Sequence, residues 1–402
     1  MTLALAALVA LGLFRILSRT KIMQAAAVAP AFVIVAGLCV SFLYRGLGAP
    51  ALPTNWGASL PEAGLAALVF VSAAQIQVSR FARHCPASFR LTIGGAPLFL
   101  LICTLCAFVL LPQLSVPSAL LLGAILMLNG AAFDRKAVTA TPAPAAIKAA
   151  VRMESAAIIA FGAPVAVLIA GYATAPGAGQ VALEPLLETS VAALGGFASG
   201  GAAGYLAAKW ASRAPGHPAG RYAFYAALFS VVFAALLGFN AIIAAGAAGL
   251  VWGQETDASA TTRLRLRRVV EQSVPPAAYF LFGAVLGARL LEADLLSAIF
   301  AMAAVTVMRA GPRLATLQSS PLPKESQVFL AWFGGAPGAA SALFLVSLLD
   351  DAMIVDHEAL LTVAALAVLA GVFAARLTSR PLANAFLRQT AMAKKRRMYA
   401  AE

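Results

Sequence analysis

Long apolar segments separated by short polar loops run along the whole chain. Most have the length, about 20 residues, that carries an α-helix across about 30 Å of hydrocarbon. They lack the alternation of apolar and polar residues over about 10 positions that marks a membrane β-barrel strand. The pattern therefore predicts an all-α polytopic membrane protein with thirteen spans, at about residues 2–17, 22–44, 62–80, 91–112, 116–134, 146–172, 184–209, 221–238, 240–253, 270–290, 293–312, 326–349 and 357–378.

Two spans contain residues that interrupt a helix. Span 5 includes Asn129-Gly130, and span 12 includes Gly334-Gly335-Ala336-Pro337-Gly338. Unpaired backbone groups at membrane depth are tolerated only where they face protein or a water-filled cavity. A pair of broken helices at matching positions of two repeats is typical of the substrate site of a secondary transporter. We therefore expect spans 5 and 12 to be broken and to cross, although glycine-rich stretches also permit close helix packing.

The positions of the two broken spans divide the chain into repeats, because each is the fifth span of a group of six. This predicts a single transmembrane domain over residues 1–402, with repeat one at about 1–172 and repeat two at about 221–378. A linker helix at 184–209 joins the repeats, and a short basic tail follows at 379–402.

Composition supports a lipid-facing surface. Hydrophobic residues make up 61% of the chain and charged residues only 11%, whereas a soluble domain carries about 25% charged residues. The net charge of +13 does not indicate nucleic-acid binding, because the basic residues lie in short loops between apolar segments, as they do on the inner side of membrane proteins.

The distribution of charge predicts the orientation. If the N-terminus is outside, only Arg45 and Arg289 of the 29 Lys and Arg residues fall on the outer side, so that 27 fall on the inner side. The acidic residues gather outside, at Glu184, Glu188, Glu292, Asp294, Asp350, Asp351, Asp356 and Glu358. We expect a bacterial inner-membrane protein with its N-terminus outside and its basic C-terminus in the cytoplasm, near anionic lipid.

Other reactive residue types do not form a recognisable site. Cys103 and Cys106 lie inside an apolar run and are interpreted as packing residues. His84, His217 and His357 fall in loops without the spacing of metal ligands. The sequence has no phosphate-binding loop and no nucleophile–base motif, so we expect neither an enzyme nor a metal or cofactor site.

Several segments, in order along the chain, resemble the monovalent cation:proton antiporter superfamily, sodium/proton exchanger branch. Leu60-Pro61-Glu62 resembles the opening of its third helix, and Glu154-Ser155 resembles the GES motif of its sixth. The match at residues 236–253 (LLGFNAIIAAGAAGLVWG) is the closest, and Trp332-Phe333-Gly334 resembles the start of WFGPRG in the twelfth helix. The resemblance implies two inverted six-helix repeats, alternating access, exchange of monovalent cations for protons, and a homodimer.

The family's ion-binding acids are missing from the matching positions. These positions read Val71, Gly130 and Ile158-Ile159, and such residues have no carboxylate to hold a cation or carry a proton. A shift of four residues in span 5 would instead place Asp134 on the family aspartate, but it requires an insertion and a compensating deletion. Without the shift, Asp134 is a charge at the inner side, neutralised by Arg135 and Lys136.

Glu154 and Arg309 are opposite charges inside spans 6 and 11, and the resemblance implies that they form an ion pair joining the two helices. Alternatively, Glu154 is a proton-binding site or faces a loop. The candidate substrate-binding residues are Asn129, Asp134, Glu154, Ser155 and Asn240. The uncharged members of this set either line a cavity or make interhelical hydrogen bonds.

The sequence thus predicts a secondary transporter of the cation:proton antiporter type with an acid-poor core. Two alternatives stay open: a transporter-fold protein that binds a partner or senses the membrane, and a transporter of a neutral or anionic solute. The expected partners are the lipid bilayer, protons, monovalent cations and a second copy of the chain, but no nucleic acid.

Overall fold

The computed structural model describes residues 30–46, 59–130, 144–174, 183–213, 219–256, 260–291, 293–349 and 353–399. Regular structure within these ranges is helical, with one isolated β-bridge. In chain order, the elements are α3 (Pro30–Gly46), α4 (Ser59–Ala73), α5 (Val78–His84), α6 (Pro86–Arg90), η1 (Leu91–Gly95), α7 (Ala96–Leu110), α8 (Val116–Met127), α10 (Ala145–Ala157), η2 (Ile158–Gly162), α11 (Ala163–Ala173), α12 (Leu183–Arg213), α13 (Ala219–Leu236), α14 (Ala241–Glu255), α15 (Ala260–Leu286), η3 (Gly287–Leu291), α16 (Leu295–Val305), α17 (Val307–Leu317), α18 (Lys324–Phe333), α19 (Ala339–Ser347) and α20 (His357–Tyr399).

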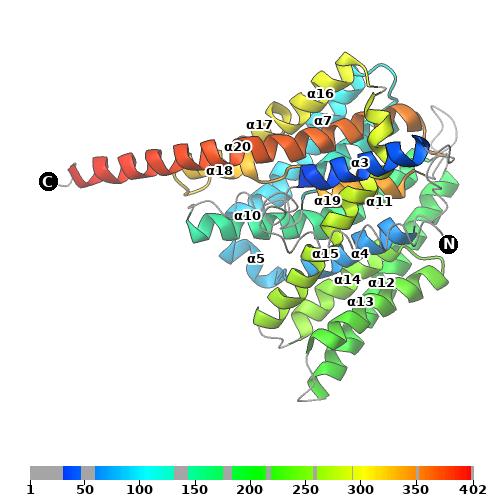
Figure 1. Cartoon of the computed structure of the whole chain (residues 1–402). Helices are drawn as coiled ribbons and strands as arrows, with labels where there is room; N and C mark the ends of the chain where they lie inside the picture. The colour runs from blue at the N-terminus through cyan, green and yellow to red at the C-terminus, as the bar shows by residue number, and fades with distance from the viewer. Residues whose placement is uncertain are drawn as a thin grey trace.

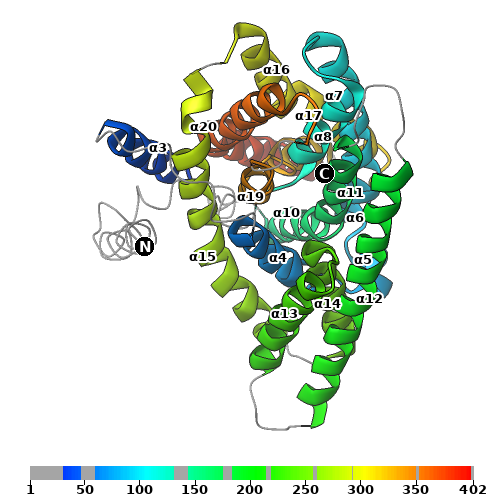
Figure 2. The same cartoon turned by 90° about the vertical axis from the view of Figure 1, so that its right-hand side faces the viewer.

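Most long helices lie side by side along one direction, and the end of α20 projects beyond the others (Figures 1 and 2). Six helices in the described part of the chain are long and apolar enough to cross a membrane. A seventh span is added if α4 and α5, which meet at an angle of 68°, count as one. The protein is therefore a multi-pass membrane protein, as its sequence predicts. The predicted first span, at residues 2–17, lies outside the described residues.

Two segments without helical structure meet inside the helical bundle. Helix α8 ends at Met127, and the gap between α18 and α19 covers residues 334–338. Asn129 and Pro337 form an antiparallel β-bridge, and the Gly130 N–H donates to the Ala336 carbonyl at 3.0 Å. Gly335 has φ +71°, a conformation that glycine adopts without the Cβ clash of other residues. The predicted crossing of two broken helices is confirmed, and we call these two segments the crossing.

Close packing of α12 against α14 explains the glycine-rich sequence of α12. Gly196, Gly200 and Gly204 recur every fourth residue and so lie on one helix face. A Cβ atom at any of these glycines would lie 2.6 Å or less from a backbone carbonyl oxygen, either within α14 or of the residue directly before it. Small residues at such an interface let two membrane helices approach closely.

Two helices extend beyond the predicted spans that they contain. Helix α15 begins at Ala260, before the predicted start of span 10 near residue 270. It includes Arg267 and Glu271, which form an ion pair, 2.7 Å apart, that is buried inside the protein. The last helix continues through the predicted tail to Tyr399. The ring of Phe386 in this continuation packs against Phe329 of α18 at a tilt of 46°, with 5.0 Å between ring centroids, so α20 stays packed on the bundle beyond the expected end of span 13.

Candidate functional site at the crossing

The backbone groups freed at the crossing are bound by serine hydroxyls. Ser341, in the first turn of α19, donates to the Leu128 carbonyl at 2.6 Å and accepts from the Gly338 N–H at 3.3 Å. Ser155 on α10 donates to the Gly130 carbonyl at 3.1 Å. These bonds satisfy polar groups that would otherwise be buried without a partner. They also join α10 and α19 to the segment that follows α8.

Glu154 on α10 is fully buried and forms an ion pair with Arg313 of α17. The contact is bidentate: Arg313 Nη2 lies 2.8 Å from Glu154 Oε2, and Nη1 contacts Oε1. Arg313 also donates to the Leu330 and Ala331 carbonyls, each at 2.9 Å. Such two-point pairing is among the strongest side-chain interactions, and it engages both carboxylate oxygens of Glu154.

The prediction that Glu154 pairs with Arg309 is therefore wrong. Arg309 lies one turn before Arg313 on the same face of α17 and donates to the Trp332 carbonyl at 2.7 Å. Sequence reasoning missed Arg313, which directly follows the predicted end of span 11 at residue 312. Two arginines four residues apart in an apolar span were the available signal, but the sequence does not reveal which of them reaches Glu154.

The two arginines compensate the broken end of α18. Its last carbonyls, from Leu330 to Trp332, have few backbone donors because the helix stops at Phe333. A helix C-terminus carries partial negative charge, which guanidinium groups offset. Gly334 makes this approach possible, since a Cβ there would lie 2.3 Å from Glu154 Oε2 and 2.0 Å from Arg313 Nη2.

Two buried polar groups at the crossing lack hydrogen-bond partners. Asn129 is 1% exposed, and neither its Oδ1 nor its Nδ2 has a partner. Arg309 is 3% exposed, and its Nε atom has none. Buried polar side chains are usually satisfied, so these atoms are exceptions among the described residues.

Asn240 has a structural role at the start of another helix. Asn240 caps the start of α14, where its Oδ1 accepts from the N–H groups of Ile242 and Ile243 at 3.1 and 3.0 Å; this is an N-cap interaction. Asp134 lies outside the described residues. Val71 and Ile159, at the positions that the sequence resemblance matches to family acids, are buried in α4 and in the π-helical turn η2.

The structure reveals a second buried polar group that the sequence did not indicate. Arg267 of α15 contacts both Glu271 and the side-chain oxygen of Gln75, which follows α4. The Gln75 amide in turn donates to the Val71 carbonyl at 2.7 Å. This network links α15 to the bend between α4 and α5. Among the described residues, no cluster of three His, Cys, Asp or Glu side chains could hold a metal ion.

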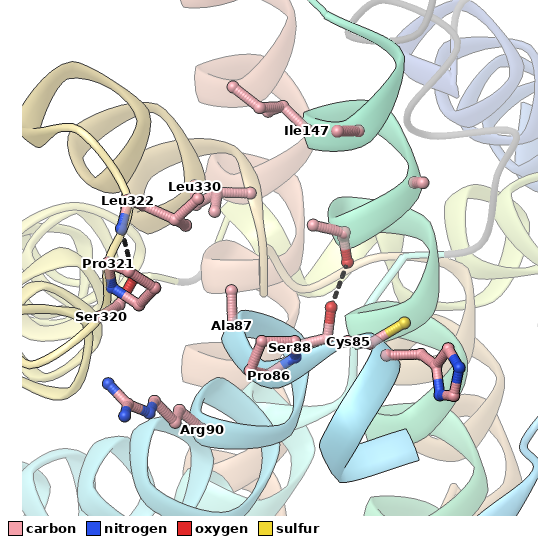
Figure 3. A pocket seen from close by; sticks show the side chains of 14 residues that line it. Cys85, Pro86, Ala87, Ser88, Arg90, Ile147, Ser320, Pro321, Leu322 and Leu330 are labelled. Atoms are coloured by element: carbon pink, nitrogen blue, oxygen red, sulfur yellow. Dashed lines mark hydrogen bonds between the residues drawn. The ribbon is translucent and has the colours of Figure 1, made fainter. Parts of the chain in front are cut away.

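Two cavities open beside α10. One, of about 300 Å³, lies between α6, α10 and the loop before α18 (Figure 3). Its walls are mainly apolar, and Ser88 at its edge donates to the Ala150 carbonyl at 2.9 Å. The other, of about 420 Å³, lies between the α4–α5 bend, α10 and α15, and is lined by Gln75, Gln77, Arg80, Phe81, His84, Cys85, Met153, Arg263 and Leu264.

The sequence matches the family described as sodium/hydrogen exchanger, transmembrane, over residues 3–385. The chain belongs to the sodium/hydrogen exchanger family. Members of this family are membrane transporters that exchange monovalent cations and protons. The family assignment agrees with the resemblance of the sequence segments to this family and with the crossing of two broken helices.

Solved structures of a sodium/proton antiporter share the fold of this chain. The sodium proton antiporter MjNhaP1 from Methanocaldococcus jannaschii at pH 8 superposes with a TM-score of 0.74 and 17% identity, covering 96% of this chain and 99% of that one. An electron-microscopy structure of MjNhaP1 gives a TM-score of 0.64 and 15% identity, with 94% and 96% covered. No relative among curated proteins matches the sequence.

Proposed function

We propose that this chain is a secondary transporter of the cation:proton antiporter type with an acid-poor core, and that it does not carry out ordinary sodium/proton exchange. The observation that carries the proposal is the pairing of the Glu154 carboxylate with Arg313. Glu154 is the one carboxylate at the crossing in the described residues, and Arg313 occupies both of its oxygens.

The physical argument concerns what a sodium/proton exchange site must offer. A mechanism in which a cation and a proton compete for one site needs a carboxylate that can bind either of them. Besides the paired Glu154 and Arg313, the polar side chains in the described part of the crossing are the Asn129 carboxamide, the Ser155 and Ser341 hydroxyls and the Arg309 guanidinium. Neutral oxygens bind sodium without any exchange for a proton, and a guanidinium repels sodium.

Alternating access in this proposal comes from movement of the helices that carry the crossing against the helices beside them. The contacts from Ser155 and Ser341 tie α10 and α19 to the crossing, which favours their moving as one body. The proposal includes a homodimer in the bacterial inner membrane, with the N-terminus outside. Basic residues of α5, α10 and α18 lie at the end of the bundle from which α20 projects (Figure 1), which supports a cytoplasmic C-terminus.

The test is proton flux in everted membrane vesicles, with sodium, potassium and lithium supplied in turn. We expect no sodium-driven flux above that of vesicles without the protein. Robust flux that survives both Glu154→Gln and Asp134→Asn would overturn the assignment of the site. Flux abolished by Asp134→Asn alone would instead identify Asp134 as the family aspartate, and the chain would then be an ordinary antiporter.

One alternative has an observation of its own. A transporter of an anionic solute would require a buried cation without a carboxylate partner at the crossing, and Arg309 is such a group. A partner-binding or sensing protein remains the second alternative, and it would show no flux with any solute.

A further inference from the structure

The cavity of about 300 Å³ shown in Figure 3 lies among segments that the charge pattern predicts on the inner side of the membrane. Its walls come from residues 84–90, from the first turns of α10, and from residues 320–322 between α17 and α18, with Leu330 of α18 behind them. The inner ends of membrane helices are where the headgroups of the inner leaflet meet a protein. A ligand of this cavity is therefore expected to come from the cytoplasm or from that leaflet.

The cavity combines apolar walls with positive charge at its edge. Ala87, Ile147 and Leu322 line it from three different segments (Figure 3). Arg90 lines it as well, and its Nη1 donates to the Ser319 hydroxyl at 3.1 Å. That hydroxyl is neutral, so the contact does not offset the charge of Arg90. Among the described residues that line the cavity, there is no Asp or Glu. An arginine beside an apolar cavity fits a ligand that joins an anionic group to an apolar part.

The cavity can be reached from outside the protein. Pro86, Ala146, Ala149 and Pro321 line it and are exposed. Its volume is at the lower end of the range of about 300–1,000 Å³ for pockets that hold small molecules. The space is therefore suited to one extended apolar chain.

The inner wall of the cavity belongs to residues that support the buried ion pair. Leu330 is fully buried in this wall, and its carbonyl accepts from Arg313, which pairs with Glu154 of α10. Ile147 and Ala150 line the cavity from α10 itself. A ligand in the cavity therefore contacts both α10 and α18, the two helices that Arg313 links to one another.

We propose that this cavity binds one acyl chain of an anionic phospholipid from the inner leaflet, with the lipid phosphate on Arg90. The apolar walls remove the chain from water, and the planar guanidinium group matches a phosphate. The bound lipid then stabilises the packing of α10 against α18. This inference goes beyond the proposed transport function and does not depend on which solute the crossing binds.

The experiment measures thermal unfolding of the full-length protein, purified in detergent, stripped of lipid and then supplied with one compound at a time. Dioleoyl phosphatidylglycerol and dioleoyl phosphatidylcholine have the same chains but differ in net charge, and glycerol 3-phosphate has a phosphate without chains. We expect phosphatidylglycerol to raise the midpoint by about 2–4 °C more than phosphatidylcholine does, and glycerol 3-phosphate to leave it unchanged. An equal rise with the two lipids, or a rise with glycerol 3-phosphate, would overturn the proposal.

Variants locate the lipid in the cavity. Arg90→Gln should remove the difference between the two lipids, whereas Arg83→Gln should keep it, because Arg83 is exposed on α5 and does not line the cavity. Ala149→Trp fills the cavity and should abolish the response to phosphatidylglycerol, and Ala146→Trp does the same if that variant does not fold. Ala82→Trp, on the exposed surface of α5, is the control and should respond like the unmodified protein. A response that persists in the cavity-filling variants, or that Arg83→Gln reduces as much as Arg90→Gln does, contradicts this site.

Discussion

At the scale of single residues, the crossing is organised by which arginine reaches Glu154. Both Arg309 and Arg313 face α18, and the position of its last carbonyls decides their partners. Arg313 contacts Leu330 and Ala331 and reaches Glu154, whereas Arg309 stops at Trp332. The geometry thus separates an arginine paired with a carboxylate from one bound to a backbone carbonyl.

Changing Glu154 tests this separation. Glu154→Gln should lower the free energy of unfolding by about 3–5 kcal/mol, because it leaves Arg313 buried without a carboxylate. Arg313→Gln combined with Glu154→Gln should recover part of that loss, whereas Arg309→Gln combined with it should not. Thermal unfolding of the purified single and double variants measures the recovery in each combination. Recovery with Arg309→Gln instead would mean that Arg309 is the true partner.

At the scale of helices and breaks, Ser341 holds the two broken segments together. Its hydroxyl bridges the Gly338 N–H, at the start of α19, and the Leu128 carbonyl, just past the end of α8. Both segments lack helical bonds at this point, so one side chain replaces contacts that an unbroken helix would make within itself.

Removing that hydroxyl should therefore cost more than removing another serine from the same helix. Ser341→Ala is expected to destabilise the protein by about 1–3 kcal/mol, since it leaves the Leu128 carbonyl buried and unpaired. Ser347→Ala is the control, because Ser347 donates only to the carbonyl of Phe344 in its own helix. Equal midpoints for the two variants in thermal unfolding would show that the bridge contributes nothing.

The sequence predicted these breaks but not the contacts around them. Gly334, Gly335 and Pro337 lie close together inside an apolar span, and such residues weaken a helix. The identity of the ion pair depends on how α17 packs against α18, which apolar periodicity does not encode. The same limit applies to Gln75, whose bond to Arg267 of α15 joins residues far apart in the sequence.

At the scale of the whole molecule, the positions of the charged residues agree with the predicted sides of the membrane. Arg289, one of the two arginines that the topology places outside, is paired with Glu358, an acid predicted to lie on the same side. The pair offsets the positive charge of Arg289 on that side. Glu358 lies in the first turn of α20, and the opposite end of this helix projects from the bundle (Figure 1).

Cysteine labelling tests the orientation. In a variant with the four native cysteines changed to alanine, a cysteine at Ala293 should react with a membrane-impermeant maleimide added to intact cells. A cysteine at Arg265 should react only after the membrane is opened. Asp294 is exposed at the start of α16, so access at Ala293 is not hindered by packing. Labelling of Arg265→Cys but not of Ala293→Cys in intact cells would reverse the topology.

The most direct test of the central claim is uptake of radioactive sodium into proteoliposomes under an imposed pH gradient. Because Arg313 occupies both oxygens of Glu154 and no other described carboxylate lies at the crossing, we predict uptake equal to that of liposomes without protein. Sodium uptake that depends on the pH gradient and is lost in Glu154→Gln, with the protein still folded, would contradict this account.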